Sequence, residues 1–157
     1  MVADAAQCAG AWADIRFYDD RWPALAECAG FMVAGDLATL RRGLTLGNNG
    51  PWQLVVAIGH NSTRLAMSRE FLAQGVELAT IVHPTAVVSR LSSVGPGSVV
   101  IAGATVNARS SVGLACIINT GAIVDHDSVI AAGVHICPAV ALAGGVTVGE
   151  LVTIGIG

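Results

Sequence analysis

The chain has 157 residues, enough for one domain or two small ones, and only 12% of them are charged. The net charge is −3 and the eight basic residues are scattered, so we expect no nucleic-acid partner. The four cysteines show neither C-x-x-C spacing nor the framework of a small secreted domain. The first residues contain no basic n-region, so we expect no signal peptide. These features predict a reduced, cytoplasmic protein.

The mean hydropathy of +0.67 raises the question of a membrane span. Residues 128–149 contain no Asp, Glu, Lys or Arg and are long enough to cross a bilayer. Glycine and proline interrupt this segment, however, and a six-residue repeat continues through it. We therefore expect no membrane insertion, but an oligomer in which apolar outer faces are covered.

Helices and strands alternate in the predicted N-terminal half. The expected elements are a helix at 2–11, a strand at 15–18, an edge strand at 31–34, a helix at 37–43, a turn at 47–51, a strand at 54–58 and a helix from 62 to 74. Asp36 can cap the second helix, and Gly75 suits the C-terminus of the third. The apolar run at 54–58 is typical of a parallel strand covered on both faces.

This alternation predicts a Rossmann-like α/β unit over residues 1–80. Such a unit should open on a strand and a phosphate-binding turn, whereas this chain opens on a helix and contains no G-x-G-x-x-G motif, so its first strand is expected to be missing. Polar residues follow the predicted strands at the edge where such sheets bind ligands: Asp19, Asp20, Gly59 and Asn61. They could contact a nucleotide or simply form turns. Arg64, on the first turn of the third helix, could approach a phosphate or lie in solvent.

From residue 82 onward every sixth residue is aliphatic, and the residue four positions later is small or β-branched. The aliphatic positions are Val82, Val88, Val94, Val100, Val106, Val112, Ile118, Val124, Ile130, Ile136, Leu142, Val148 and Ile154. This period predicts a parallel β-helix over residues 81–157, with three hexapeptides in each triangular coil. Gly95 and Gly113, which directly follow aliphatic positions, are expected to serve tight corners that need backbone freedom. The repeat ends in mid-coil, so the domain is expected to be incomplete at its C-terminus.

The tripeptide Asp125-His126-Asp127 falls at a predicted corner. Histidine can take up and release a proton near neutral pH, and an adjacent carboxylate can hold one tautomer of its ring. The tripeptide could therefore act as a general base, or it could be a solvated corner.

The whole chain resembles the bacterial nucleotide-sugar N-acetyltransferases and their relatives, the sialic acid O-acetyltransferases, which carry hexapeptide repeats. The resemblance rests on residues 17–20, residues 56–61 with Arg64, residues 83–86, residues 118–122 and residues 125–127. It implies a left-handed β-helix behind the Rossmann-like unit, acetyl-coenzyme A as co-substrate and a homotrimer with active sites between subunits. Residues 1–80 would bind the nucleotide sugar and residues 81–157 would carry the acyltransferase site.

The resemblance also implies residue roles. His126 would be the general base and Asp127 its partner, although the family often has Glu at the second position. His135, which points outward beside interior Ile136, would bind the coenzyme, together with Gly144 and Ile156.

Gly144 could offer its backbone N–H to the thioester oxygen, or be a plain corner glycine. Asn119 could orient the acceptor or His126, or hydrogen-bond within its own corner. The outward apolar residues Ile117, Ile123 and Val129 would be covered in the trimer.

We predict acetyl transfer from acetyl-coenzyme A to the amine of a nucleotide-activated amino sugar. O-acetylation of a sugar such as sialic acid is the alternative within the same class. The missing first strand and last coils leave open a trimeric binding module that no longer catalyses. A zinc site like that of γ-carbonic anhydrases lacks support, because His126, His135 and Cys137 have no third suitable histidine nearby, so no metal is expected.

Overall fold

The computed structural model describes residues 1–45 and 52–156. The predicted turn at 47–51 lies outside the described residues. Tertiary contacts divide the chain into two compact units, one formed by residues 10–52 and the other by residues 1–9 together with 53–157. Among the residues described, no helix is long and apolar enough to cross a membrane.

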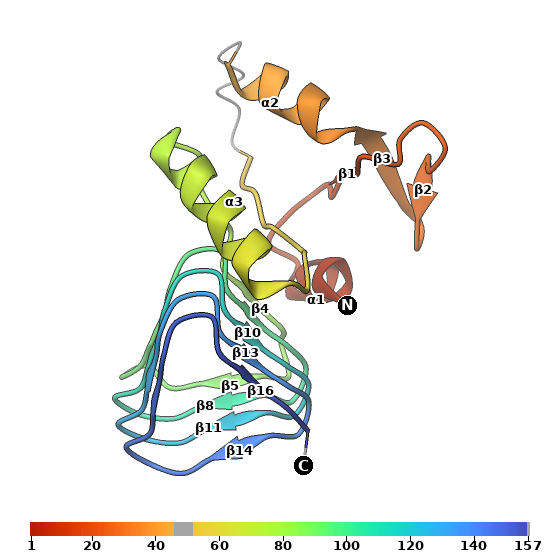
Figure 1. The fold of residues 1–157 in the computed structure, drawn as a ribbon. Helices are drawn as coiled ribbons and strands as arrows, with labels where there is room; N and C mark the ends of the chain where they lie inside the picture. Colours follow the sequence, from red (N-terminus) through yellow and green to blue (C-terminus); the bar gives the residue numbers. More distant parts are fainter. Residues whose placement is uncertain (46–51, 157) are drawn as a thin grey trace. The chain divides into compact units, whose positions relative to one another are not determined.

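The unit of residues 10–52 contains a small mixed sheet and one helix (Figure 1). The elements are β1 (Phe17–Tyr18), β2 (Glu27–Cys28), β3 (Phe31–Gly35) and α2 (Leu37–Thr45). The strand β3 lies in the centre, parallel to β1 and antiparallel to β2. Residues 31–34 were expected to form an edge strand, and this was wrong because β3 lies between β1 and β2. The strand β2 could not be predicted, since it has only two residues, both exposed, and no alternating pattern.

Two local interactions stabilise the sheet and the helix of this unit. The rings of Phe17 and Phe31 meet edge to face with centroids 5.4 Å apart, which joins β1 to β3. The carboxylate of Asp36 accepts the backbone N–H of Thr39 at 2.7 Å, so the predicted helix cap is confirmed.

In the other unit, α1 (Val2–Ala9) packs against β4 (Ile81–Val82), and α3 (Asn61–Ala73) ends at the predicted glycine, since Gly75 has a φ of +78°. The run at 54–58 does not form the predicted strand. Only Leu54 pairs, through one parallel bridge to Leu78. Side-chain burial alone cannot create a strand without a hydrogen-bonding neighbour along its length, and the apolar character of the run serves packing, with Val56 buried.

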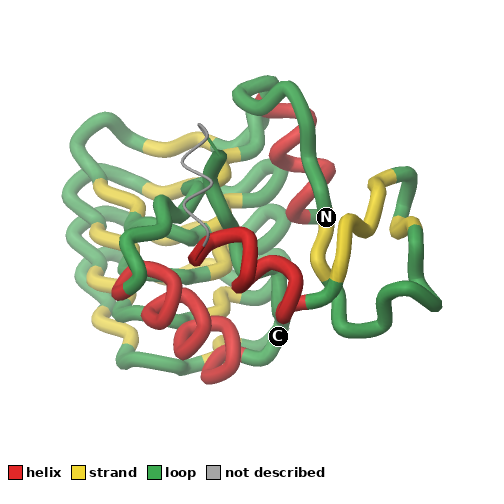
Figure 2. The backbone as a smooth tube through the Cα atoms, turned by 90° about the horizontal axis from the view of Figure 1, so that it is seen from above, coloured by secondary structure: helices red, strands yellow, loops and turns green. Residues whose placement is uncertain are grey.

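The remainder is a triangular parallel β-helix, as predicted (Figures 1 and 2). Its strands are β4, β5 (Val87–Val88), β6 (Ser93–Val94), β7 (Val99–Val100), β8 (Thr105–Val106), β9 (Ser111–Val112), β10 (Ile117–Ile118), β11 (Ile123–Val124), β12 (Val129–Ile130), β13 (His135–Ile136), β14 (Ala141–Leu142), β15 (Thr147–Val148) and β16 (Thr153–Ile154). They form three sheets, in the orders β16-β13-β10-β7-β4, β14-β11-β8-β5 and β15-β12-β9-β6. Each strand therefore pairs with the strand one coil away, eighteen residues along the chain, as Val99 pairs with Ile117 and Ile117 with His135.

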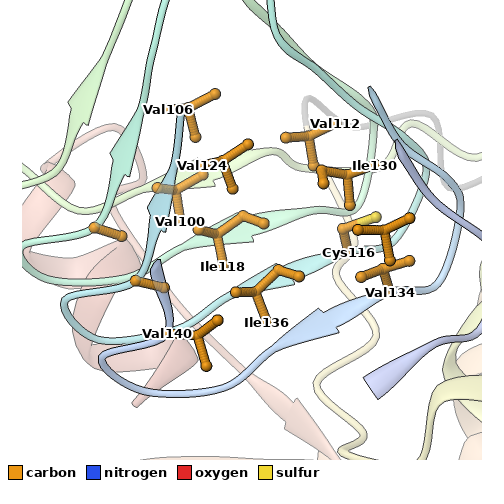
Figure 3. Packing of buried hydrophobic residues seen from close by; sticks show 13 residues of the cluster. Val100, Val106, Val112, Cys116, Ile118, Val124, Ile130, Val134, Ile136 and Val140 are labelled. Carbon is orange, nitrogen blue, oxygen red and sulfur yellow. The ribbon is translucent and has the colours of Figure 1, made fainter. Parts of the chain in front are cut away.

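The aliphatic positions of the repeat fill the interior in columns, of which Val100, Ile118 and Ile136 form one (Figure 3). These three side chains have no solvent exposure. Serine can also occupy interior positions, because its hydroxyl forms hydrogen bonds with backbone groups of the neighbouring coil. Ser98, for example, donates to the carbonyl of Gly113 at 2.7 Å and accepts from the backbone N–H of Cys116 at 2.8 Å.

The corners follow the same period, with one residue in every six in the left-handed conformation. These residues are Gly97, Gly103, Arg109, Ala115, Gly121, Asp127, Gly133, Ala139, Gly145 and Leu151. The expectation for Gly95 and Gly113 was wrong, because neither has a positive φ. Glycine is needed at these positions because the backbones of neighbouring coils approach closely there. A Cβ on Gly95 would lie 2.6 Å from the carbonyl oxygen of Gly113 in the next coil.

Candidate active site

His126 lies at the corner between β11 and β12, where its side chain is 60% exposed. The neighbouring Asp125 fixes this corner, because its carboxylate accepts the backbone N–H of His126 at 2.8 Å and the side-chain amide of Asn107 at 2.8 Å. Asn107 belongs to the preceding coil. The backbone carrying the ring is therefore held from both its own coil and its neighbour.

Asp127 contacts the ring directly. Its Oδ2 lies 2.7 Å from Nδ1 of His126, and Arg109 donates to Oδ1 at 2.5 Å and to Oδ2 at 2.7 Å. The hydrogen bonds from Arg109, and then from His126, hold the pKa of Asp127 well below its ordinary range. An ionised carboxylate can only accept, so Nδ1 must donate, and a neutral His126 then carries its lone pair on Nε2. This is the tautomer that a general base needs.

Arg109 was missed by the sequence analysis. It stands eighteen residues before Asp127, one full coil away, so the repeat itself contains the signal that would place the two side chains together. Asp127 has a φ of +60°, a left-handed conformation that aspartate tolerates better than most residues. This conformation lets the carboxylate stand between the guanidinium of Arg109 and the imidazole of His126.

Gly144 lies one coil beyond His126, directly beneath its ring. A Cβ added to Gly144 would lie 2.6 Å from Cε1 and 2.7 Å from Nε2 of His126, so only glycine leaves room for the imidazole. The backbone N–H of Gly145 donates to the carbonyl of His126 at 2.8 Å and fixes the spacing of the two corners. The structure thus brings together His126, Asp127 and Gly144, while the role of Gly144 as an oxyanion donor stays a prediction.

His135 and Asn119 form a second cluster on a different face. His135 is on β13, in the sheet that begins at β4, whereas His126 lies between the other two sheets. The amide oxygen of Asn119 accepts the backbone N–H of Thr120 at 2.8 Å, so its nitrogen faces Nε2 of His135 at 3.0 Å and donates to it. Asn119 therefore hydrogen-bonds within its own corner and contacts the ring of His135, and its contact with the acceptor stays a prediction.

The pKa of His135 lies below its ordinary value, because the ring is partly buried and because the positive charge of Arg64 opposes a second cation. A neutral His135 is what the hydrogen bond from Asn119 requires, since its Nε2 must accept. The ring lines a cavity of about 110 Å³ with its own chain, including residues 56–59, Cys116 and Ile117. The face on which His135 was expected to point outward is therefore partly covered within one subunit.

A larger cavity, of about 300 Å³, is formed by Gly59, His60, Asn61 and Ser62 together with Leu151 and Thr153 of the last coil. It contains two of the predicted substrate-binding residues. The side-chain nitrogen of Asn61 donates to the carbonyl of Leu151 at 3.0 Å and to Oγ1 of Thr153 at 2.9 Å, so this amide fastens α3 to the β-helix. Ile156, near the end of the chain, is 76% exposed.

Arg64 contradicts both expectations for it, since it is only 2% exposed and its guanidinium donates to acceptors of the protein itself. Its guanidinium donates to the carbonyls of Ala115 at 2.8 Å, Gly133 at 2.9 Å, Ile58 at 3.0 Å and Gly59 at 3.1 Å, and to Oδ1 of Asn61 at 2.8 Å. Burial lowers its pKa. Arg64 is thus a structural cation that anchors α3 to two stacked corners of the β-helix.

Asp19 and Asp20 belong to the unit of residues 10–52, where both carboxylates have local partners. Asp19 accepts from the side chain and backbone of Arg21, which lowers the pKa of Asp19 to about 2. Asp20 accepts the backbone N–H of Leu37 at 3.1 Å. The contact of Asp19 is that of a turn residue, whereas Asp20 contacts the first residue of α2. Nucleotide binding by this pair stays a prediction.

Replacing Arg109 by glutamine is expected to raise the pKa of Asp127, because Arg109 makes the largest contribution to lowering it. A carboxyl whose pKa is lowered by folding stabilises the folded state at pH values above about 3.9, its ordinary pKa. This contribution is lost as the pH falls through the lowered pKa. The variant should therefore be less stable than wild type at neutral pH and approach it in acid. NMR titration of the Asp127 carboxyl checks the shift, with Arg16→Gln, whose partner is Asp14, as the control. An unchanged Asp127 titration in Arg109→Gln would contradict the role given to Arg109.

Comparisons with known proteins agree with this architecture. Residues 1–71 match the family described as the PglD N-terminal domain. No curated protein matches the chain significantly. WeeI from Acinetobacter baumannii, at 20% identity and a TM-score of 0.62 over 78% of this chain and 55% of its own, shares the fold.

Two solved structures are much more similar. The acetyltransferase domain of PglB from Neisseria gonorrhoeae, in complex with acetyl coenzyme A, is 37% identical over 98% of this chain and 72% of its own, with a TM-score of 0.87. PerB from Caulobacter crescentus, in complex with CoA and GDP-perosamine, is 39% identical over 99% of this chain and 72% of its own, with a TM-score of 0.86. The predicted α/β part followed by a left-handed β-helix is confirmed by these matches, and the chain belongs to the hexapeptide-repeat sugar N-acyltransferase family.

Proposed function

We propose that the protein transfers the acetyl group of acetyl-coenzyme A to the amine of a nucleotide-activated amino sugar, with His126 as general base. As a family member the chain is an acetyl-coenzyme A-dependent acyltransferase, and its relatives support a nucleotide sugar as the acceptor. Two structures of the Caulobacter perosamine N-acetyltransferase, at 38% identity, are histidine variants with CoA and GDP-perosamine bound. The study of histidine variants of that enzyme with both ligands bound supports a histidine at the active site of the present chain.

The observation that carries the proposal is the column of Arg109, Asp127, His126 and Gly144 over three coils. Arg109 keeps Asp127 ionised, Asp127 holds the proton of His126 on Nδ1, and Gly144 leaves the space in which the ring lies. Nε2 is then the basic nitrogen on an exposed side chain. Each member of the column acts on the next, so the arrangement prepares one nitrogen to accept a proton.

In the proposed reaction, the amine nitrogen attacks the thioester carbon while Nε2 of His126 takes the amine proton. The C–N bond forms, negative charge develops on the thioester oxygen, and the backbone N–H of Gly144 would stabilise it. Collapse breaks the C–S bond, and the imidazolium returns the proton to the leaving thiolate of coenzyme A. Asp127 stabilises the imidazolium between these two transfers.

We further propose a homotrimer in which the apolar outer positions are covered by neighbouring subunits. Ile123 and Val129 are 40% and 47% exposed in the single chain, which supports this assembly. Ile117 is buried already and lines a cavity of its own subunit, so the expectation that an interface covers it was wrong. Light scattering that gives the mass of a monomer at assay concentrations would contradict the trimer.

The remaining assignments belong to the same proposal. Residues 1–80 would bind the nucleotide sugar through Gly59 and Asn61, which line the cavity beside the last coil, and through Asp19 and Asp20. Asn119 would contact the acceptor. His135 and Ile156 would contact the coenzyme, which would lie in the groove of the trimer. Because His135 and His126 occupy different faces of one chain, a shared site requires a second subunit.

The test is release of the coenzyme A thiol from acetyl-coenzyme A in the presence of candidate acceptors. The panel holds GDP-perosamine, other nucleotide-linked 4-amino sugars, their hydroxyl counterparts and sialic acid. Release that requires an amino sugar supports the proposal. Release with hydroxyl acceptors alone would replace it by O-acetylation, and no release with any acceptor would favour a non-catalytic binding module.

Replacing Gly144 by alanine is expected to lower kcat by about tenfold to a hundredfold, because the new Cβ would displace the His126 ring by a distance that catalysis does not tolerate. Gly149→Ala is the matched control, since its Cβ would meet only Cγ2 of Val152 at 4.0 Å. Steady-state thiol release checks both variants. Equal rates for Gly144→Ala and wild type would show that the ring position is unimportant.

A further inference from the structure

A group of potential metal ligands lies apart from the column of His126. Among the described residues, Asp4, Cys8 and His83 place their ligand atoms within 4.8 Å of one another. They offer a carboxylate oxygen, a thiol sulfur and an imidazole nitrogen. None of the three has a part in the proposed acetyl transfer, and spacing along the sequence could not reveal them because His83 lies far from the other two.

The fold holds these side chains together through two packed elements. Asp4 and Cys8 are four residues apart on α1, so they point from the same face of the helix. His83 directly follows β4, against which α1 packs (Figure 1). The helix is fixed in this position because Ala5 and Ala6 are buried. The packing of α1 against β4 therefore brings the three ligands together.

The ring of His83 is oriented by Thr85. Its Nδ1 accepts the backbone N–H of Thr85 at 3.1 Å and lies 2.8 Å from the hydroxyl of the same residue. The hydroxyl in turn accepts the backbone N–H of Gly103 at 3.2 Å. A neutral ring then carries its proton on Nε2. Metal binding by Nε2 would move this proton to Nδ1, which would donate it to the threonine oxygen in place of the bond from the Thr85 N–H, as metal-bound histidines commonly do.

We propose that Asp4, Cys8 and His83 bind a divalent cation of the zinc class, with water or an external group as the fourth ligand. A thiolate and a carboxylate supply two negative charges, which match the charge of the ion, and thiolate with imidazole favours zinc over magnesium or calcium. Ligand atoms around a tetrahedral zinc lie about 3.3–3.8 Å apart, given Zn–N and Zn–S lengths of about 2.0 and 2.3 Å. Small rotations of the exposed Asp4 and Cys8 side chains would reach this geometry. The bound ion would fasten α1 to the first strand of the β-helix.

Cobalt(II) titration of the reduced, tag-free protein tests this site, because cobalt bound by a thiolate gives a sulfur-to-metal charge-transfer band. We expect one cobalt ion per chain, the band to vanish in Cys8→Ser and to weaken in Asp4→Asn, and zinc to displace the cobalt. Cys28→Ser is the matched control, since Cys28 is another exposed cysteine and lies in the unit of residues 10–52. It should keep the full band.

Thermal unfolding supplies a second readout. Zinc should raise the melting temperature of wild type and of Cys28→Ser, and should not raise that of Cys8→Ser, because a ligand stabilises only the state that binds it. The absence of a thiolate–cobalt band in wild type, or a band that survives Cys8→Ser, would overturn the proposal. Neither readout depends on acetyl transfer, so a failure here leaves the proposed function untouched.

Discussion

Replacing His126 by alanine is expected to lower kcat by about 10²- to 10⁴-fold, the usual contribution of a general base. The loss should be in turnover, because the ring removes the proton of the attacking amine. Thiol release from acetyl-coenzyme A with a saturating acceptor measures the effect. The variant should keep the melting temperature of wild type, since the His126 side chain is exposed.

The two carboxylates that flank His126 provide a matched control pair. The carboxylate of Asp127 contacts Nδ1 of the ring, whereas the carboxylate of Asp125 accepts from the backbone N–H of His126 and from the side chain of Asn107. Asp127→Asn should therefore lower kcat much more than Asp125→Asn. Equal losses in the two variants would show that the corner matters only for its backbone shape, and full activity of His126→Ala would remove the histidine from the mechanism.

Replacing Arg64 by alanine is expected to destabilise the protein by about 4 kcal/mol, because several buried carbonyls would lose their donor and a cavity would remain. Arg64 donates to the corners at Ala115 and Gly133, which are stacked one coil apart, and to the backbone at Ile58 and Gly59. Lysine should rescue little of this loss, since an ammonium has three donors and lacks the planar fork of the guanidinium. Denaturant unfolding measures these differences.

Arg69→Ala is the control for Arg64→Ala on the same helix. Arg69 pairs with Glu150 at 2.6 Å, with both side chains about half exposed, so its loss should cost about 0.5 kcal/mol or less. A similar cost for both variants would mean that the buried guanidinium does not anchor α3. Because Asn61 and Gly59 depend on the same anchor, Arg64→Ala should also raise the KM for the sugar acceptor.

The β-helix was predictable because its interior accepts one aliphatic and one small side chain in each hexapeptide. This packing requirement produces a six-residue period that is visible in the sequence. The same reasoning explains why His126 and Asp127 could be predicted as a pair, since they are adjacent and share one corner. The positions of Arg109, which was missed, and of Gly144, which was predicted from the resemblance, follow from the same repeat. Each is eighteen residues from a member of that pair, and three hexapeptides make one coil.

Other features depend on tertiary contacts that no local pattern encodes. The apolar run at 54–58 predicts burial correctly for Val56, but strand formation requires a neighbour that pairs along the whole run, and only Leu54 has one. Arg64 illustrates the same limit, because an arginine on a first helical turn gives no sign that four backbone carbonyls will surround it. The grouping of Asp4 and Cys8 with His83 likewise appears only once α1 docks on β4.

The position of the coenzyme sulfur in a crystal structure with coenzyme A and an amino-sugar nucleotide tests the proposed active site most directly. The sulfur should lie beside Gly144, and the acceptor nitrogen should lie about 2.6–3.2 Å from Nε2 of His126, the range over which a general base can act. Binding of both ligands away from the corner of His126, for example with the sulfur in the cavity beside His60, would contradict the account.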